Sequence, residues 1–79
     1  MRYYPLFLDI AGRLCVVVGG GKVAQRKVER LLACGARVAV VGKRLTAGLK
    51  ALAAQGAIVR RGAGYKAAHI RDAFLVIGA

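Results

Sequence analysis

The chain has 79 residues, of which 58% are hydrophobic and only 6% are aromatic, and its formal net charge is +11. This apolar content excludes a disordered chain and favours a core of aliphatic side chains, as in a parallel sheet covered by helices. No apolar run reaches the ~18 residues that a membrane span needs, and no secretory leader is recognised. We therefore expect a cytoplasmic protein with no membrane partner.

The excess of basic residues favours a polyanionic partner, such as a nucleic acid, an anionic lipid or a ligand with many carboxylates. The 14 Lys and Arg residues are distributed along the chain and do not form one run, so a solvated basic surface is an equally good interpretation. No helix-turn-helix, zinc-finger or stacking-aromatic pattern is visible, which disfavours a nucleic-acid partner. A basic nucleic-acid-binding module therefore stays as the alternative function.

The first half of the chain has the pattern of a strand, a helix and a second strand. Residues 3–10 are extended in character and residues 11–13 are typical of a turn. Residues 14–18 form an apolar run of the kind found in strands buried on both faces. An apolar stripe formed by Ala24, Val28, Leu31 and Leu32 predicts a helix over residues 22–34, which Gly35 ends. Residues 38–41 are a second buried strand.

The second half continues the alternation of helices and strands. Thr46 is a predicted N-cap, and the apolar residues from Leu45 to Ala53 predict a short helix that Gly56 ends. Residues 57–60 are a third strand, less apolar and so closer to an edge. Residues 66–72 are predicted as a short helix or helical turn, and residues 73–77 as a fourth, apolar strand.

Alternating strands and helices of this length predict right-handed crossovers and a parallel sheet. The expected fold class is α/β, a Rossmann-like parallel sheet in the order 3-2-1-4, with a ligand crevice above strands one and four. Residues 1–79 would be one NAD(P)-binding domain. Since the sheet is only half of a doubly wound domain, we expect the chain to be part of a longer dehydrogenase.

Residues 19–24 (GGGKVA) match the pattern G-x-G-x-x-G/A of dinucleotide-binding turns. Gly19 would permit the tight turn, Gly21 a close approach of the backbone to a pyrophosphate, and Ala24 close packing of the helix on the strand. The helix N-terminus and the charge of Lys22 would attract the phosphates. A turn that only saves space, and an S-adenosylmethionine site, remain the alternatives.

The second strand lacks the acidic residue that usually binds the ribose hydroxyls of NAD at its end. Gly42, Lys43 and Arg44 stand there instead. Backbone groups remain available to hold the ribose, so NAD is not excluded. The two cations also suit a 2′-phosphate, so NADP is not excluded. A further alternative is that Lys43 and Arg44 are solvated loop residues without a ligand.

Several further residues have no assigned chemistry. Cys15 and Cys34 match no zinc or redox spacing and are predicted to be reduced, buried packing residues. His69 has no cysteine or acidic cluster near it in sequence, so it is interpreted as a surface or helix-end residue. No metal ligands are predicted.

Residues 4–8 (YPLFL), 16–24 (VVVGGGKVA), Arg26-Lys27, Leu31-Leu32 and 73–77 (AFLVI) together resemble the N-terminal domain of the siroheme synthase family. Members of that family are precorrin-2 dehydrogenases and sirohydrochlorin ferrochelatases. The resemblance covers essentially the whole chain. It implies an NAD-dependent oxidation of precorrin-2 to sirohydrochlorin in siroheme biosynthesis, with ferrochelatase activity in bifunctional parents. The tetrapyrrole substrate carries many carboxylates, which suits the basic charge.

The resemblance also implies which residues hold the cofactor. Backbone around Lys22 and Val23 would bind it, the loop with Lys43 and Arg44 would contact it, and the end of the fourth strand near Gly78 would close the crevice. The family's acid/base aspartate and its dimerisation segment lie beyond the position of Ala79. We therefore expect no catalytic residue in this chain, Asp72 included, weak NAD(H) binding without turnover, and a homodimer only in the full-length parent. A non-catalytic Rossmann fragment remains an alternative.

Overall fold

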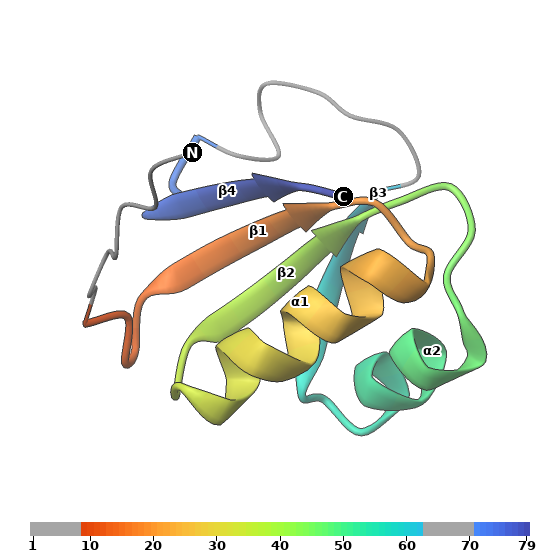
Figure 1. Cartoon of the computed structure of the whole chain (residues 1–79), viewed down its shortest axis with the longest axis horizontal. Helices are drawn as coiled ribbons and strands as arrows, with labels where there is room; N and C mark the ends of the chain where they lie inside the picture. The colour runs from red at the N-terminus through yellow and green to blue at the C-terminus, as the bar shows by residue number, and fades with distance from the viewer. Residues whose placement is uncertain (1–8, 63–70) are drawn as a thin grey trace, which may run out of the picture.

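The computed structural model describes residues 9–62 and 71–79, which form a parallel sheet with two helices (Figure 1). The strands lie in the order β3-β2-β1-β4, and all pairings among them are parallel. This confirms the predicted Rossmann-like order. The elements in chain order are β1 (Leu14–Val18), α1 (Lys22–Ala33), β2 (Arg37–Val41), α2 (Ala47–Ala54), β3 (Ile58–Gly62) and β4 (Leu75–Gly78).

The apolar run of β1 lies between β2 and β4, and its middle residues have no exposed surface. Alternate side chains of a strand point to opposite faces of the sheet. Cys15 and Val17 therefore join the larger core under α1 and α2, while Val16 joins a smaller cluster with Ala39 and Val41. Both helices lie on the same face of the sheet in Figure 1. The prediction that β1 is buried on both faces is confirmed.

The first helix packs through the predicted stripe, with Ala24, Val28 and Leu31 buried. Its end has the hydrogen bonds of a Schellman motif. The amide of Gly35 donates to the Leu32 carbonyl at 2.9 Å and the amide of Ala36 donates to that of Leu31 at 3.1 Å. Gly35 has a φ of +81°, so it is the left-handed residue that ends the helix and turns the chain into β2.

Thr46 caps the second helix as predicted, because its Oγ1 accepts a hydrogen bond of 3.1 Å from the amide of Leu49. The same hydroxyl donates to Oε1 of Gln25 on α1 at 2.5 Å. Leu49 is fully buried between the helices and the sheet. One side chain therefore begins α2 and joins it to α1.

The edge strands depart from the prediction in their bounds and in their exposure. The third strand continues to Gly62 and is irregular between Val40 and Val41 of its neighbour. The fourth strand begins only at Leu75, and Phe74 and Val76 are 43% and 41% exposed. Within the described residues β4 pairs with β1 alone, so its apolar sequence does not make it a buried strand.

The prediction of a buried cysteine is confirmed for Cys15 and wrong for Cys34, which is exposed. Cys34 is the C-cap of α1 and follows the last buried residue of the helix, Leu31. Its side chain is exposed because the chain leaves the helix at this point. The predicted extended segment 3–10 and the predicted helix 66–72 lie mostly outside the described residues. Within the described part of the chain, no helix has the length and hydropathy to cross a membrane.

Candidate dinucleotide-binding site

The glycine turn joins β1 to α1 at the carboxyl edge of the sheet (Figure 1). Gly19 has a φ of +142°, which side chains rarely adopt, and a Cβ there would lie 2.5 Å from the carbonyl oxygen of Ala79. Its amide donates to the Val41 carbonyl at 2.7 Å. Gly19 therefore makes the tight turn from β1 into α1. This turn lies between the ends of the two neighbouring strands, β2 and β4. Ala24 is 1% exposed and packs closely, as predicted.

The loop of residues 42–46, which we call the β2 loop, lies directly against this turn. A Cβ on Gly20 would overlap the carbonyl oxygen of Arg44, and a Cβ on Gly42 would lie 3.0 Å from that of Gly19. The amide of Thr46 donates to the Gly20 carbonyl at 3.0 Å. The turn and the loop are thus one backbone unit. The sequence pattern did not identify Gly20 as a contact residue, because that pattern leaves its position unspecified.

The N-terminus of α1 is open to a ligand. Gly21 is its N-cap, makes no side-chain capping bond, and no acidic residue stands in the first turn. The first amides of a helix have no partner within the helix and carry partial positive charge. A Cβ on Gly21 would meet no atom of residues 9–62 and 71–79 within 4 Å. Packing of the described residues does not account for this glycine, and its role in the approach of a pyrophosphate stays a prediction.

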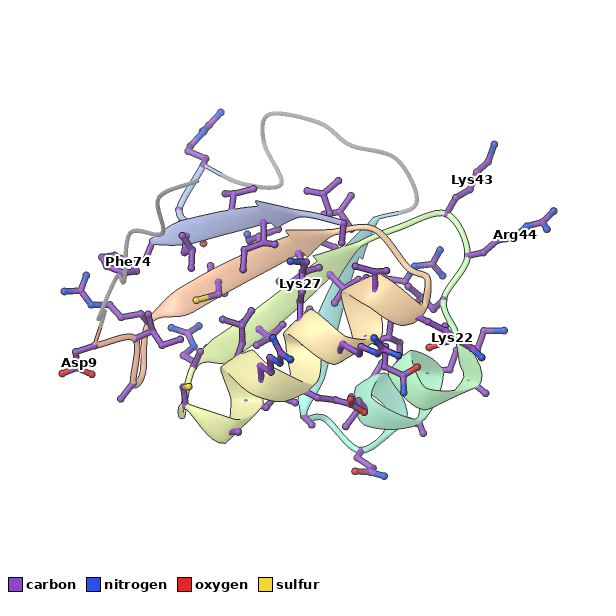
Figure 2. The ribbon with its side chains drawn as sticks, viewed as in Figure 1. Asp9, Lys22, Lys27, Lys43, Arg44 and Phe74 are labelled. Atoms are coloured by element: carbon purple, nitrogen blue, oxygen red, sulfur yellow. The ribbon has the colours of Figure 1, made fainter. Side chains whose placement is uncertain are left out.

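Lys22 and Val23, the first residues of α1, are both exposed beside the turn. Figure 2 shows Lys22 at the same end of the molecule as Lys43 and Arg44, whose side chains extend outward from the β2 loop. Three cationic side chains therefore lie at the end of the molecule where β1 and β2 have their carboxyl ends. This arrangement suits a ligand with more than one phosphate.

Arg60 of β3 holds the β2 loop in place. Its Nη2 donates to the carbonyl oxygens of Gly42 at 2.7 Å and Lys43 at 3.0 Å. Arg60 pairs in register with Val40 on the neighbouring strand, which places its guanidinium near the end of β2. Sequence reasoning had counted Arg60 only among the dispersed basic residues. The sequence signal that could have identified Arg60 is a basic residue in the strand that follows the loop.

Gly78 ends β4 opposite Val18, and Ala79 donates its amide to the Val18 carbonyl at 2.9 Å. Among the described residues, no atom would lie within 4 Å of a Cβ on Gly78. The structure thus brings the predicted cofactor residues to one edge of the sheet, and whether they bind the cofactor stays a prediction. They are Gly19, Gly21, Lys22, Val23, Ala24, Lys43, Arg44 and Gly78.

Asp72 is engaged in an ion pair outside this unit. Asp72 pairs with Arg61, the two being 2.7 Å apart, and this hydrogen bond holds the pKa of the Asp72 carboxyl below its usual value. His69 lies outside the described residues. Residues 9–62 and 71–79 contain no cluster of His, Cys, Asp and Glu that would bind a metal ion.

Comparison with families of known proteins matches residues 6–79 to a family described as "Putative NAD(P)-binding". Two curated relatives are siroheme synthases, from Neisseria meningitidis serogroup C (strain 053442) and from Nitrosococcus oceani. They are 49% and 43% identical to this chain over 79 residues, all of the chain. The chain spans only 16% and 17% of their lengths.

A solved structure gives the same picture of the fold. It is described as SirC, precorrin-2 dehydrogenase, and superposes with a TM-score of 0.88 at 28% sequence identity. The match covers 98% of this chain and 39% of that one. The fold of this chain is therefore shared with part of that protein.

Proposed function

Since the chain belongs to the NAD(P)-binding family whose model matches residues 6–79, we propose that it is the cofactor-binding part of a precorrin-2 dehydrogenase. The proposed reaction is the oxidation of precorrin-2 to sirohydrochlorin, and the proposed location is the cytoplasm. The similarity to siroheme synthases and to SirC supports this substrate. Ferrochelatase activity and a dimer are proposals for a longer parent protein only.

The observation that carries the proposal is the space around Gly21. This residue begins α1, has free space where a Cβ would stand, and lies beside the unpaired amides of the helix. A pyrophosphate placed there would accept hydrogen bonds from these amides and interact with Lys22. A side chain at position 21 would occupy the same space.

The rest of the cofactor would extend along the carboxyl edge of the sheet in both directions from this turn. The adenosine ribose would lie over the β2 loop, and the nicotinamide between the ends of β1 and β4, near Gly78. A bound nicotinamide supplies a hydride acceptor. The residues of this chain bind and orient it, and we assign no proton acceptor among residues 9–62 and 71–79.

Titration of the purified 79-residue chain with NADH, followed by nicotinamide fluorescence and by calorimetry, tests the proposal. We expect weak but saturable binding, and a large loss of affinity in Gly21→Val. Ala33→Val places a valine at the exposed opposite end of α1 and serves as the control. The proposal fails if wild type shows no signal at about millimolar NADH, or if Gly21→Val binds as well as wild type.

A further inference from the structure

We propose that the solvent-facing side of α1 is a docking surface for an acidic helix of a partner protein, which Arg26 and Arg30 bind. The inference goes beyond the proposed function, because neither arginine belongs to the glycine turn or the β2 loop. It begins from a line of three exposed cations along α1, Lys22, Arg26 and Arg30, which we call the α1 ridge. Residues four positions apart lie on one face of a helix, in successive turns.

The α1 ridge lies on the side of the helix that the fold does not cover. The buried residues of α1 are Ala24, Val28 and Leu31, and helical periodicity places Arg26 on the opposite side. Figure 1 shows α1 packed on the sheet, with α2 beside it. Arg26 and Arg30 are both exposed. Within the described part of the chain, the ridge therefore faces solvent.

The spacing of the ridge costs stability in the isolated protein. Like charges at positions i and i+4 of a helix repel each other, and Arg26 stands in this relation to both Lys22 and Arg30. The one carboxylate of α1, Glu29, accepts a hydrogen bond of 3.3 Å from Gln25. Among residues 9–62 and 71–79 the ion pair joins Arg61 to Asp72, away from the ridge. A carboxylate supplied from outside would relieve this repulsion.

Charge and spacing favour an acidic helix as the occupant. A rise of about 1.5 Å per residue places Arg26 and Arg30 about 6 Å apart along the axis of α1. Carboxylates at every fourth position of a second helix have the same spacing. Such a helix, lying along α1, would therefore bring one carboxylate to each arginine. The guanidinium of arginine binds a carboxylate with two parallel hydrogen bonds, which makes this pairing selective for position.

The two flanks of the ridge indicate how the occupant lies. Val23 and Glu29 stand on opposite sides of the line through Arg26, since each is three residues from it. Val23 is 59% exposed, so an apolar side chain beside the carboxylates of the occupant would cover it. Glu29 repels an anion on its own side. A nucleic acid fits less well, because α1 has no aromatic side chain on which a base would stack.

The experiment measures binding of labelled helical peptides to the purified 79-residue chain by fluorescence anisotropy. One peptide carries glutamate at every fourth position, and a second has the same composition with its glutamates distributed around the helix. Arg26→Gln/Arg30→Gln removes two charges from the ridge. Lys43→Gln/Arg71→Gln removes two exposed charges outside the helices and is the charge-matched control. Circular dichroism and thermal unfolding of each protein accompany the titrations.

We expect the first peptide to bind wild type about fivefold more tightly than the second, as two exposed ion pairs supply. Arg26→Gln/Arg30→Gln should abolish this difference, the control should keep it, and added salt should reduce it. The ridge variant should unfold at the same temperature as wild type or a higher one, because it loses a repulsion. Its affinity for NADH should stay that of wild type, since the ridge arginines lie outside the proposed cofactor site.

The inference is overturned if the two peptides bind equally, or if the control loses the difference as the ridge variant does, because overall charge would then account for binding. Duplex DNA that binds through Arg26 and Arg30 more tightly than the first peptide would identify a nucleic acid as the occupant instead. A lower unfolding temperature of the ridge variant would show that the arginines serve the fold. Loss of NADH binding in that variant would assign them to the cofactor site.

Discussion

The carbonyl oxygen of Arg44 occupies the place where a side chain of Gly20 would stand. This contact joins the loop after β2 to the turn after β1, so the two segments that bind different ends of a dinucleotide in the proposed function are held in one geometry. It involves backbone atoms of Arg44 only. The side chain of Arg44 can therefore be varied without disturbing it, whereas Gly20 cannot.

Gly20→Ala is expected to destabilise the protein, because its Cβ would force the turn away from the β2 loop. We expect a loss of about 1–3 kcal/mol in the free energy of unfolding, typical of overpacking at a rigid contact. Urea unfolding followed by circular dichroism measures it. Gly21→Ala is the matched control: position 21 is extended and open, so this variant should keep its stability but bind NADH less tightly. Equal stability of the two variants would contradict the assignment.

Thr46→Ala is expected to lower stability by about 1 kcal/mol through loss of the N-cap, and further through loss of the bond to Gln25. In a domain of this size each kcal/mol lowers Tm by roughly 4–8 °C. Thr46→Ser keeps the hydroxyl and should recover most of the stability. Thermal unfolding of both variants measures the difference, and a Thr46→Ser variant as unstable as Thr46→Ala would show that the methyl group matters instead.

Arg60→Gln is expected to weaken dinucleotide binding severalfold although Arg60 need not touch the ligand. The substitution removes the bonds to the carbonyls of Gly42 and Lys43, which frees the β2 loop to adopt other conformations. Fluorescence titration with NADH measures the loss. An affinity equal to that of wild type would contradict the anchoring role of Arg60.

The pair of Arg61 and Asp72 should make a small contribution to stability that depends on pH. The bond to Arg61 lowers the pKa of Asp72 below the usual 3.8, so the folded state favours the ionised carboxylate. A depressed pKa gives stability that is complete above the unfolded value and is lost as the pH falls through the folded value. Wild type should therefore lose more stability than Asp72→Asn on acidification below about pH 4. Added salt should reduce the difference. Parallel pH profiles of the two proteins would refute this.

The two cysteines should differ in reactivity. Cys15 has no exposed surface and burial raises the pKa of its thiol, which disfavours the reactive thiolate, whereas Cys34 is exposed at the end of α1. A thiol reagent in the native state should modify one cysteine rapidly and the second only after denaturation. Cys34→Ser should abolish the fast phase. Rapid modification of Cys15 would mean that β1 is not the closed central strand.

The strand order could be predicted because the signals in this chain are local and agree with one another. The aliphatic run of β1, the stripe of α1 and the glycine at position 35 each predict the same strand–helix–strand unit. The edges were predicted less well. The sequence of β4 is as apolar as that of β1, and only its position beside a single partner in the described sheet makes Phe74 and Val76 exposed.

In the candidate site too, features set by local sequence could be predicted, whereas features set by contacts between distant residues could not. Gly19, Gly21 and Ala24 could be selected from the sequence because the turn of a dinucleotide site has a fixed spacing, and their binding of a cofactor stays a prediction. The roles of Gly20 and Arg60 depend on contacts with residues 44 and 42–43, which are distant in sequence and are brought close only by the sheet. The exposure of Cys34 depends likewise on where α1 leaves the sheet.

The parallel pairing of β1 with β4 has a consequence for the order of folding. Strands β1 and β2 are connected by one helix, whereas Cys15 pairs with Leu75 across almost the whole chain. Contacts between residues so distant in sequence close slowly, because the intervening chain must lose its conformational freedom first. Gly19 lies against Ala79, so the turn acquires its final surroundings only when β4 has been added. The strand–helix–strand unit is thus the expected folding nucleus, and the proposed dinucleotide site is expected to be completed last.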